Sequence, residues 1–146
     1  YGILARKAQR EAAEEIMARL GIEVPLNVPV RRLRVAEQQL ISIAKALSRS
    51  NHRIIIMDEP TVGIDPQSRR HILDNIKELN KQGMTVLYTT HYMEEADRLC
   101  DRVAIMDGGQ IVAMDTPRNL KSQIGDPDKT TLEDVFLKLT GRSLRD

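Results

Sequence analysis

Residues 54–57, Ile54-Ile55-Ile56-Met57, form a short unbroken apolar run that stops abruptly at two adjacent carboxylates, Asp58 and Glu59. Such a run predicts a β-strand buried on both faces, as strands of parallel sheets are. Open α/β sheets bind ligands beyond the carboxyl ends of their strands. Burying two carboxylates there without a counter-charge is costly, so the pair indicates a Mg²⁺ ion or a reacting water. The alternative is that both residues only cap the following turn, residues 60–61.

A second β-rich run covers residues 85–90 and is followed directly by His91. Neighbouring parallel strands end at the same edge of a sheet, so this histidine is expected at the same edge as the two carboxylates. A lone histidine is more often a surface or satisfied core residue, and its place at a strand end is what makes His91 a site candidate. The other two histidines have no such company and are interpreted as solvated: His52 and His71.

Helical periodicity surrounds these two strands. Apolar residues recur at helical spacing over residues 5–20 and again from about 36 to 48. A third helix is marked by Asp65 as its N-cap and Pro66 at its first position, and it ends at Gly83. These helices alternate with the two predicted strands, which favours an α/β fold with a largely parallel sheet.

The remaining sequence predicts shorter elements. They are a helix over residues 92–100, a hairpin of residues 103–106 and 111–114, and a short helix opened by residues 116–117. Thr130 and Glu133 have the spacing of a capping box, so the C-terminal residues are predicted to form a docked helix.

Composition narrows the classes of function. The 146 residues are 41% hydrophobic and 29% charged, with a net charge of +1, three tyrosines and one phenylalanine. This balance indicates a globular protein and argues against one that neutralises nucleic-acid phosphates or stacks bases. The single cysteine, Cys100, fits a reducing compartment, and no segment is long and apolar enough to cross a bilayer. We therefore expect a cytoplasmic chain whose membrane role, if any, comes through a partner.

From Leu33 to about Leu120 the chain resembles the ATP-binding cassette subunits of ABC transporters. Residues 54–59 look like the Walker B strand with its catalytic glutamate, residues 62–65 like the D-loop, and residues 89–91 like the switch-histidine segment. Residues 33–38 fall where the family carries its signature, usually read as LSGGQ. Here arginine replaces the serine, and valine and alanine replace both glycines, so close backbone approach to a γ-phosphate is in doubt.

The resemblance implies a role for each matching residue. Asp58 would hold Mg²⁺ through water, Glu59 would polarise the attacking water, and His91 would contact the γ-phosphate of ATP. The signature residues Val35, Ala36 and Glu37, together with Asp65, would act across a dimer interface on the nucleotide of a second cassette. The other implied partner is a transmembrane permease, which would hold the cassette at the inner face of the membrane.

Two sets of motifs resemble different branches of this family. Residues 37–39 and 43–47 resemble sugar-importer cassettes, whereas residues 90–97, 109–111 and 115–117 resemble exporter cassettes of the drug-resistance type. The second set is longer and favours export. A DNA-repair or translation-factor branch of the superfamily is disfavoured by the neutral charge and the few aromatic residues.

The Walker A loop, G-x-x-x-x-G-K-[ST], does not occur in this chain, which contains no Gly-Lys pair. The resemblance therefore predicts the C-terminal part of a cassette, a partial P-loop NTPase domain. Its parts would be a portion of the helical subdomain (1–50), the Walker B, D-loop and H-loop core (51–120) and a C-terminal helical extension (121–146). Without the loop, the chain alone is expected neither to bind Mg-ATP tightly nor to hydrolyse it. The rival interpretation is a non-hydrolysing docking or dimerisation module.

Overall fold

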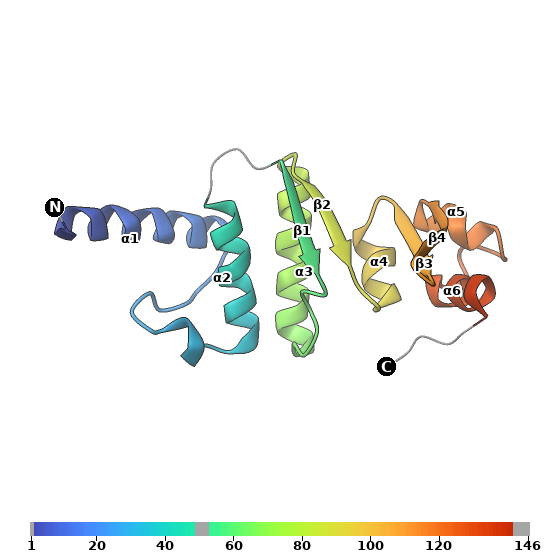
Figure 1. The fold of residues 1–146 in the computed structure, drawn as a ribbon, viewed down its shortest axis with the longest axis horizontal. Helices are drawn as coiled ribbons and strands as arrows, with labels where there is room; N and C mark the ends of the chain where they lie inside the picture. The colour runs from blue at the N-terminus through green and yellow to red at the C-terminus, as the bar shows by residue number, and fades with distance from the viewer. Residues whose placement is uncertain (1, 49–52, 142–146) are drawn as a thin grey trace. The chain divides into compact units, whose positions relative to one another are not determined.

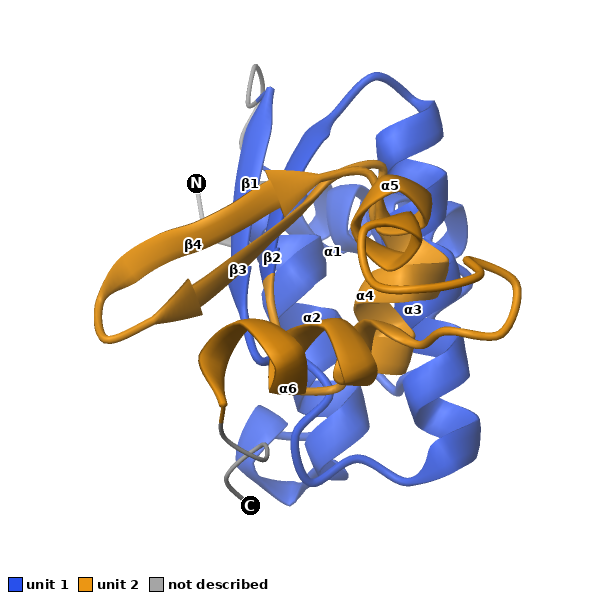
Figure 2. Cartoon of the chain, turned by 90° about the vertical axis from the view of Figure 1, so that its right-hand side faces the viewer, with its two compact units in different colours: residues 1–88 blue, residues 89–146 orange. Residues whose placement is uncertain are grey.

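The computed structural model describes residues 2–48 and 53–141, and Figure 1 shows the order of their helices and strands. The predicted solvation of His52 lies outside the described residues. Contacts divide the chain into two compact units, residues 1–88 and residues 89–146 (Figure 2). None of the helices within the described ranges is long and apolar enough to cross a membrane.

The first unit contains three of the predicted helices and both strands of the expected parallel pair. Its elements are α1 (Gly2–Arg19), a 3₁₀ turn (Val30–Arg32), α2 (Val35–Leu47), β1 (Ile54–Asp58), α3 (Pro66–Lys81) and β2 (Thr85–Thr89), whose last residue begins the second unit. β1 and β2 pair in a two-stranded sheet, and their arrows run in the same direction (Figure 1). With α3 as the connection, they form a β-α-β unit.

β1 is buried on one face only. Ile55 and Met57 are buried, but Ile54 and Ile56 are 63% and 69% exposed. The prediction of a strand buried on both faces is therefore wrong for this chain. The reason is the sheet itself: a parallel strand is buried on both faces only when further elements cover each face, and here one face of β1 stays open.

The start of α3 follows the sequence prediction. Asp65 has extended backbone, and its carboxylate accepts hydrogen bonds from the amides of Gln67 at 3.1 Å and Ser68 at 3.0 Å. Pro66 occupies the first helical position, where its missing N–H costs nothing. The predicted exposure of His71, on the same helix, is confirmed.

The second unit is built around an antiparallel hairpin and three helices. Its elements are α4 (Met93–Leu99), β3 (Val103–Asp107), β4 (Gln110–Asp115), α5 (Pro117–Ser122) and α6 (Leu132–Thr140). The hairpin turns at Gly108 and Gly109, both at positive φ, which is the conformation that two-residue hairpin turns require. The buried core of the unit consists of Ala96, Val103, Ile105, Leu120, Leu132 and Val135. The α/β class is thus confirmed, with the parallel pairing confined to β1 and β2.

The capping box of α6 lies one residue later than predicted. Thr131 is the N-cap: its hydroxyl accepts from the Asp134 amide at 3.1 Å, and the Asp134 carboxylate accepts from the Thr131 amide at 2.9 Å. The predicted pair of Thr130 and Glu133 is wrong, because the Thr130 amide is used in the preceding turn, where it donates to the Asp126 carbonyl at 2.9 Å. Both pairs have the required spacing, so spacing alone did not distinguish them.

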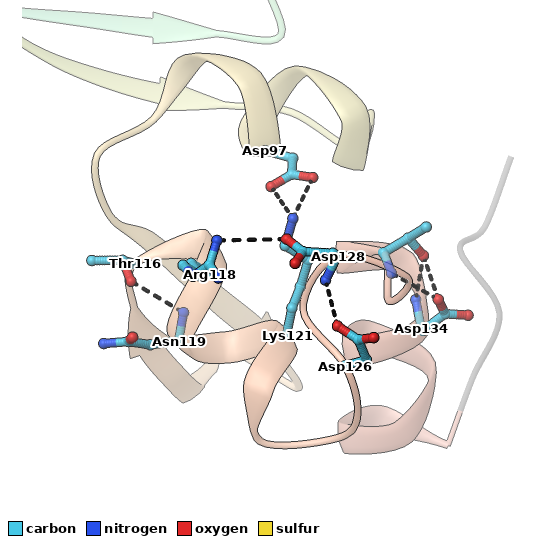
Figure 3. Close-up of polar contacts among 9 residues, drawn as sticks. Asp97, Thr116, Arg118, Asn119, Lys121, Asp126, Asp128 and Asp134 are labelled. Carbon is cyan, nitrogen blue, oxygen red and sulfur yellow. Dashed lines mark hydrogen bonds and ion pairs between the residues drawn. The ribbon is translucent and has the colours of Figure 1, made fainter.

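An ion pair joins α4 to α5 (Figure 3). The Lys121 ammonium donates to both carboxylate oxygens of Asp97 at 3.0 Å, and the two side chains are 16% and 29% exposed. A more exposed pair, Arg118 and Asp128, lies 3.5 Å apart beside it. The half-buried pair is the one placed to hold the two helices together, because exposed pairs contribute little.

Three carboxylates at helix starts have a pKa below the ordinary value of 3.8. Hydrogen bonds from the Ser68 side chain and amide lower the pKa of Asp65. The Thr116 amide lowers the pKa of Asp115, and the Thr131 side chain and amide lower that of Asp134. Each of these bonds favours the ionised form of the carboxylate.

These shifts predict a loss of stability in acid. A carboxylate whose pKa is lower in the folded state stabilises the fold fully above its unfolded pKa and loses that effect as pH falls through the folded pKa. Stability should therefore decline as pH falls below about 4. Asp134→Asn keeps an acceptor but does not titrate. In this variant the urea midpoint of unfolding should fall less steeply as the pH is lowered. The matched change Glu133→Gln should leave the slope as it is, and equal slopes in all three proteins would contradict the prediction.

Candidate functional site

The two predicted catalytic carboxylates lie together at the carboxyl end of β1. Asp58 is the last residue of the strand, Glu59 follows it, and both side chains are exposed. Glu59 has φ of +44°, the only positive φ of a non-glycine residue in the described part of the chain. This left-handed backbone costs a residue with a Cβ about 1–2 kcal/mol, and such strain concentrates at functional sites.

The turn after Glu59 is closed by backbone and side-chain contacts. The Glu59 carbonyl accepts from the Val62 amide at 3.2 Å, and the Thr61 carbonyl accepts from the Ile64 amide at 3.2 Å. Thr61 is fully buried, and its hydroxyl lies 3.5 Å from the Tyr88 hydroxyl on β2. This contact ties the turn that carries Glu59 to the neighbouring strand. It has no local sequence signal, because its two residues are 27 positions apart.

The residues of the altered signature form the start of α2. Val35 is 60% exposed and Ala36 is 8% exposed. The Glu37 carboxylate accepts from the Arg34 amide at 2.7 Å and thereby caps the helix. The Gln38 side chain donates to the Leu33 carbonyl at 2.8 Å. The segment is therefore an ordered helix start, in which Val35 is the predicted nucleotide-facing residue that reaches solvent most fully.

His91 follows the end of β2 in the second unit. It is half-buried, and its ring lies against the Tyr92 ring with centroids 4.2 Å apart and planes inclined by 38°. The hydroxyl of Thr90 accepts from the Tyr92 amide at 2.9 Å and donates to the Glu95 carboxylate at 3.2 Å. Glu95 is only 5% exposed. This buried glutamate was not predicted, because nothing in the local sequence indicates its burial.

The structure thus brings together part of the predicted site. Asp58, Glu59 and Asp65 share one segment between β1 and α3, and the predicted residues of α2 belong to the same unit. His91 lies in the other unit. Its approach to the two carboxylates stays a prediction.

Asp58 has the chemistry that a magnesium ion requires. Mg²⁺ binds hard oxygen ligands and is commonly held by one or two carboxylates together with phosphates of a substrate. Asp58 offers an exposed carboxylate at a strand end, and Glu59 offers a second beside it. Residues 2–48 and 53–141 contain no group of three or more histidine, cysteine, aspartate or glutamate side chains arranged to hold a metal ion. The residues present therefore fit a magnesium ion shared with a phosphate ligand.

Cys100 does not join this chemistry. It packs against the core of the second unit, and burial raises the pKa of its thiol, with the Asp101 charge acting in the same direction. A raised pKa keeps the thiol protonated and unreactive.

Comparison with known proteins finds curated relatives along most of the chain. The linearmycin resistance ATP-binding protein LnrL of Bacillus subtilis is 43% identical over 125 residues, which make up 86% of this chain and 40% of that protein. The ribose import ATP-binding protein RbsA 2 of Burkholderia ambifaria is 35% identical over 144 residues, or 99% of this chain and 26% of that protein. The chain therefore spans less than half the length of either relative.

Structural comparison gives the same fold. A solved ATP-binding subunit of an ABC transporter superposes with a TM-score of 0.70, covering 89% of this chain and 53% of that subunit at 22% identity. At this identity the match establishes the shared fold. No protein-family model matches the chain.

Proposed function

We propose, because this chain belongs to the family of ABC transporter ATP-binding cassettes, that it carries the water-activating part of an ATPase site that powers transport. The observation that supports the proposal is the pair Asp58 and Glu59 at the carboxyl end of β1, with Glu59 in a left-handed conformation. In that conformation the chain turns sharply, immediately after the strand ends.

The tasks divide between the two carboxylates. Asp58 would hold Mg²⁺ through water, and Glu59 would accept a hydrogen bond from the attacking water and orient it. A bound Mg²⁺ neutralises charge on the phosphates of ATP. Phosphoryl transfer depends mainly on positioning and charge stabilisation, and these two exposed carboxylates would contribute to both.

His91 would contact the γ-phosphate. Its support is the ordered loop between β2 and α4, in which the ring rests on Tyr92. An imidazole donates an N–H to a phosphate oxygen in either protonation state, provided that the correct nitrogen faces it. The loop would therefore act by holding the ring in place.

A complete site would also need a second cassette and a Walker A loop. Val35, Ala36, Glu37 and Asp65 would face the nucleotide of a second cassette, and a Walker A loop, which this sequence does not contain, would hold the phosphates. A permease subunit would place the assembly at the cytoplasmic face of a membrane. Within this proposal, residues 1–50 serve as helical subdomain, 51–120 as catalytic core and 121–146 as extension.

We propose export as the direction of transport, on the longer set of exporter-type motifs in residues 90–97, 109–111 and 115–117. The relatives point to two directions: one is named for resistance to linearmycin and another for ribose import. Import is therefore the second candidate. Its specific support is the ribose import relative, whose match extends over 99% of this chain.

The alternative to an ATPase part is a docking or dimerisation module without hydrolysis. It is favoured by the signature, where Val35 and the buried Ala36 stand in place of glycines. A Cβ at these positions restricts how closely a phosphate approaches the backbone. Hydrolysis measurements distinguish the two functions.

The chain alone is predicted to show no ATP turnover, because no Walker A loop is present to bind the phosphates. A fusion that places the region of LnrL preceding the matched segment ahead of this chain should hydrolyse ATP. Malachite-green detection of released phosphate measures the turnover of both proteins, with an intact cassette of known ATPase activity as the positive control. Steady turnover by the chain alone that is lost in Glu59→Gln would contradict the first expectation. A folded, ATP-binding fusion without turnover would favour the docking module.

A further inference from the structure

A buried carboxylate underlies the loop that carries His91. Glu95 is 5% exposed and lies in the first turn of α4. Its neighbour Glu94 is exposed and already provides a negative charge beside the positive end of the helix. Charged side chains are seldom buried unless specific contacts hold them. A negative charge at the start of the helix therefore does not by itself explain why Glu95 is buried.

That role follows from the hydroxyl of Thr90. The Glu95 carboxylate accepts from this hydroxyl at 3.2 Å, and the hydroxyl accepts from the Tyr92 amide at 2.9 Å. A hydroxyl has one proton and two lone pairs, and a carboxylate only accepts. Because Glu95 draws the proton to its side, a lone pair of Thr90 is directed to the Tyr92 amide.

Both hydrogen bonds join residues that lie on either side of His91 in the sequence. Thr90 and Tyr92 are its sequence neighbours, and the bond between them closes a tight turn with His91 at its centre. The Tyr92 ring also lies against the imidazole, with centroids 4.2 Å apart. Fixing the Tyr92 backbone therefore fixes both the turn and the surface on which the imidazole rests.

We infer that Glu95, acting through Thr90, is a positioning residue that sets the orientation of the His91 ring. The geometry of this coupling is independent of any nucleotide. Its importance for catalysis rests on the proposed function of His91.

The test uses hydrogen exchange and NMR on the complete 146-residue chain. In Thr90→Val, which removes the hydroxyl at nearly constant size, the Tyr92 amide should exchange about tenfold faster. The His91 ring signals should shift toward those of an unrestrained histidine. Thr90→Ser should restore both. Glu95→Ala should resemble Thr90→Val, whereas Glu95→Gln should keep part of the protection, because its carboxamide oxygen still accepts. The matched control is Glu94→Ala, which should change neither readout.

A purely structural role gives a different pattern. If the role were purely structural, the substitutions would raise exchange at the Leu120 and Val135 amides in the core of the unit as much as at the Tyr92 amide. That result would overturn the inference. Unchanged Tyr92 exchange and His91 signals in Thr90→Val would overturn it too. If Glu95→Ala unfolds the unit, the comparison of Thr90→Val with Thr90→Ser decides the question alone.

The effect on kcat and KM is measured separately, in the fusion protein described above. There, Glu95→Ala should lower kcat while KM for ATP stays within about twofold, the pattern of an interaction used after binding. If the loop readouts change as expected but turnover is insensitive to His91→Ala, the proposed function of His91 fails and the positioning of its ring stands.

Discussion

Glu59→Gln should reduce ATP turnover by the fusion protein about a hundredfold to ten-thousandfold, which is the usual contribution of a general base. Glutamine has the same size and makes the same demand on the left-handed backbone, but its neutral carboxamide is a much weaker proton acceptor than a carboxylate. ATP binding should persist, because Glu59 is proposed to act on water and not on the nucleotide. Phosphate release at saturating ATP measures the loss, and fluorescent-nucleotide titration measures binding.

Glu23→Gln is the matched control, since Glu23 is an exposed residue of the same unit outside the proposed site. It should leave turnover within about twofold. Equal loss in both variants would show that charge in general, and not the carboxylate at position 59, determines the rate. A fully active Glu59→Gln protein would remove Glu59 from the mechanism.

Leu120→Ala should cost about 3 kcal/mol in the free energy of unfolding of the second unit, because it leaves a cavity in a closely packed core. Leu120 is completely buried among Val103, Ile105, Leu132 and Val135. These residues come from β3, α5 and α6, so the substitution loosens all three at once. Hydrogen exchange of the Val135 amide under native conditions measures the change within this unit alone.

Leu137→Ala provides the comparison for the same chemical change at a site that is 38% exposed. Its cost should stay below about 1 kcal/mol, because water already reaches the side chain and little cavity forms. Similar costs for the two substitutions would contradict the position of Leu120 at the centre of the core.

Local features of the structure were well predicted. The cap of α3 by Asp65, Pro66 at its first helical position and the hairpin of β3 and β4 all match the sequence analysis, and the hairpin turns at Gly108 and Gly109. In each case the physical cause lies within a few residues of chain: a side chain that satisfies free amides, a ring that fixes φ, or a missing Cβ that allows positive φ. Such causes are visible in sequence.

Features that depend on distant contacts were not predicted from the sequence. The contact between the buried Thr61 and the half-buried Tyr88, and the burial of Glu95, arise when separate elements meet. The choice between two equally spaced capping boxes for α6 depended on the turn in which the Thr130 amide is used. The open face of β1 could not be predicted from its run of isoleucines. Hydrophobic side chains favour burial, but whether they are buried depends on which elements cover the strand.

The sequence by itself determined the chemistry available to this protein: two carboxylates after an apolar run, a histidine after the next, and a family of motifs in a fixed order. Tertiary structure decided what holds those groups. It put Glu59 in a strained turn fastened to β2 through Thr61, and it buried Glu95 beneath the loop of His91. The physical reason is that residue identity sets charge and hydrogen-bonding capacity, whereas burial and partners depend on which elements pack together.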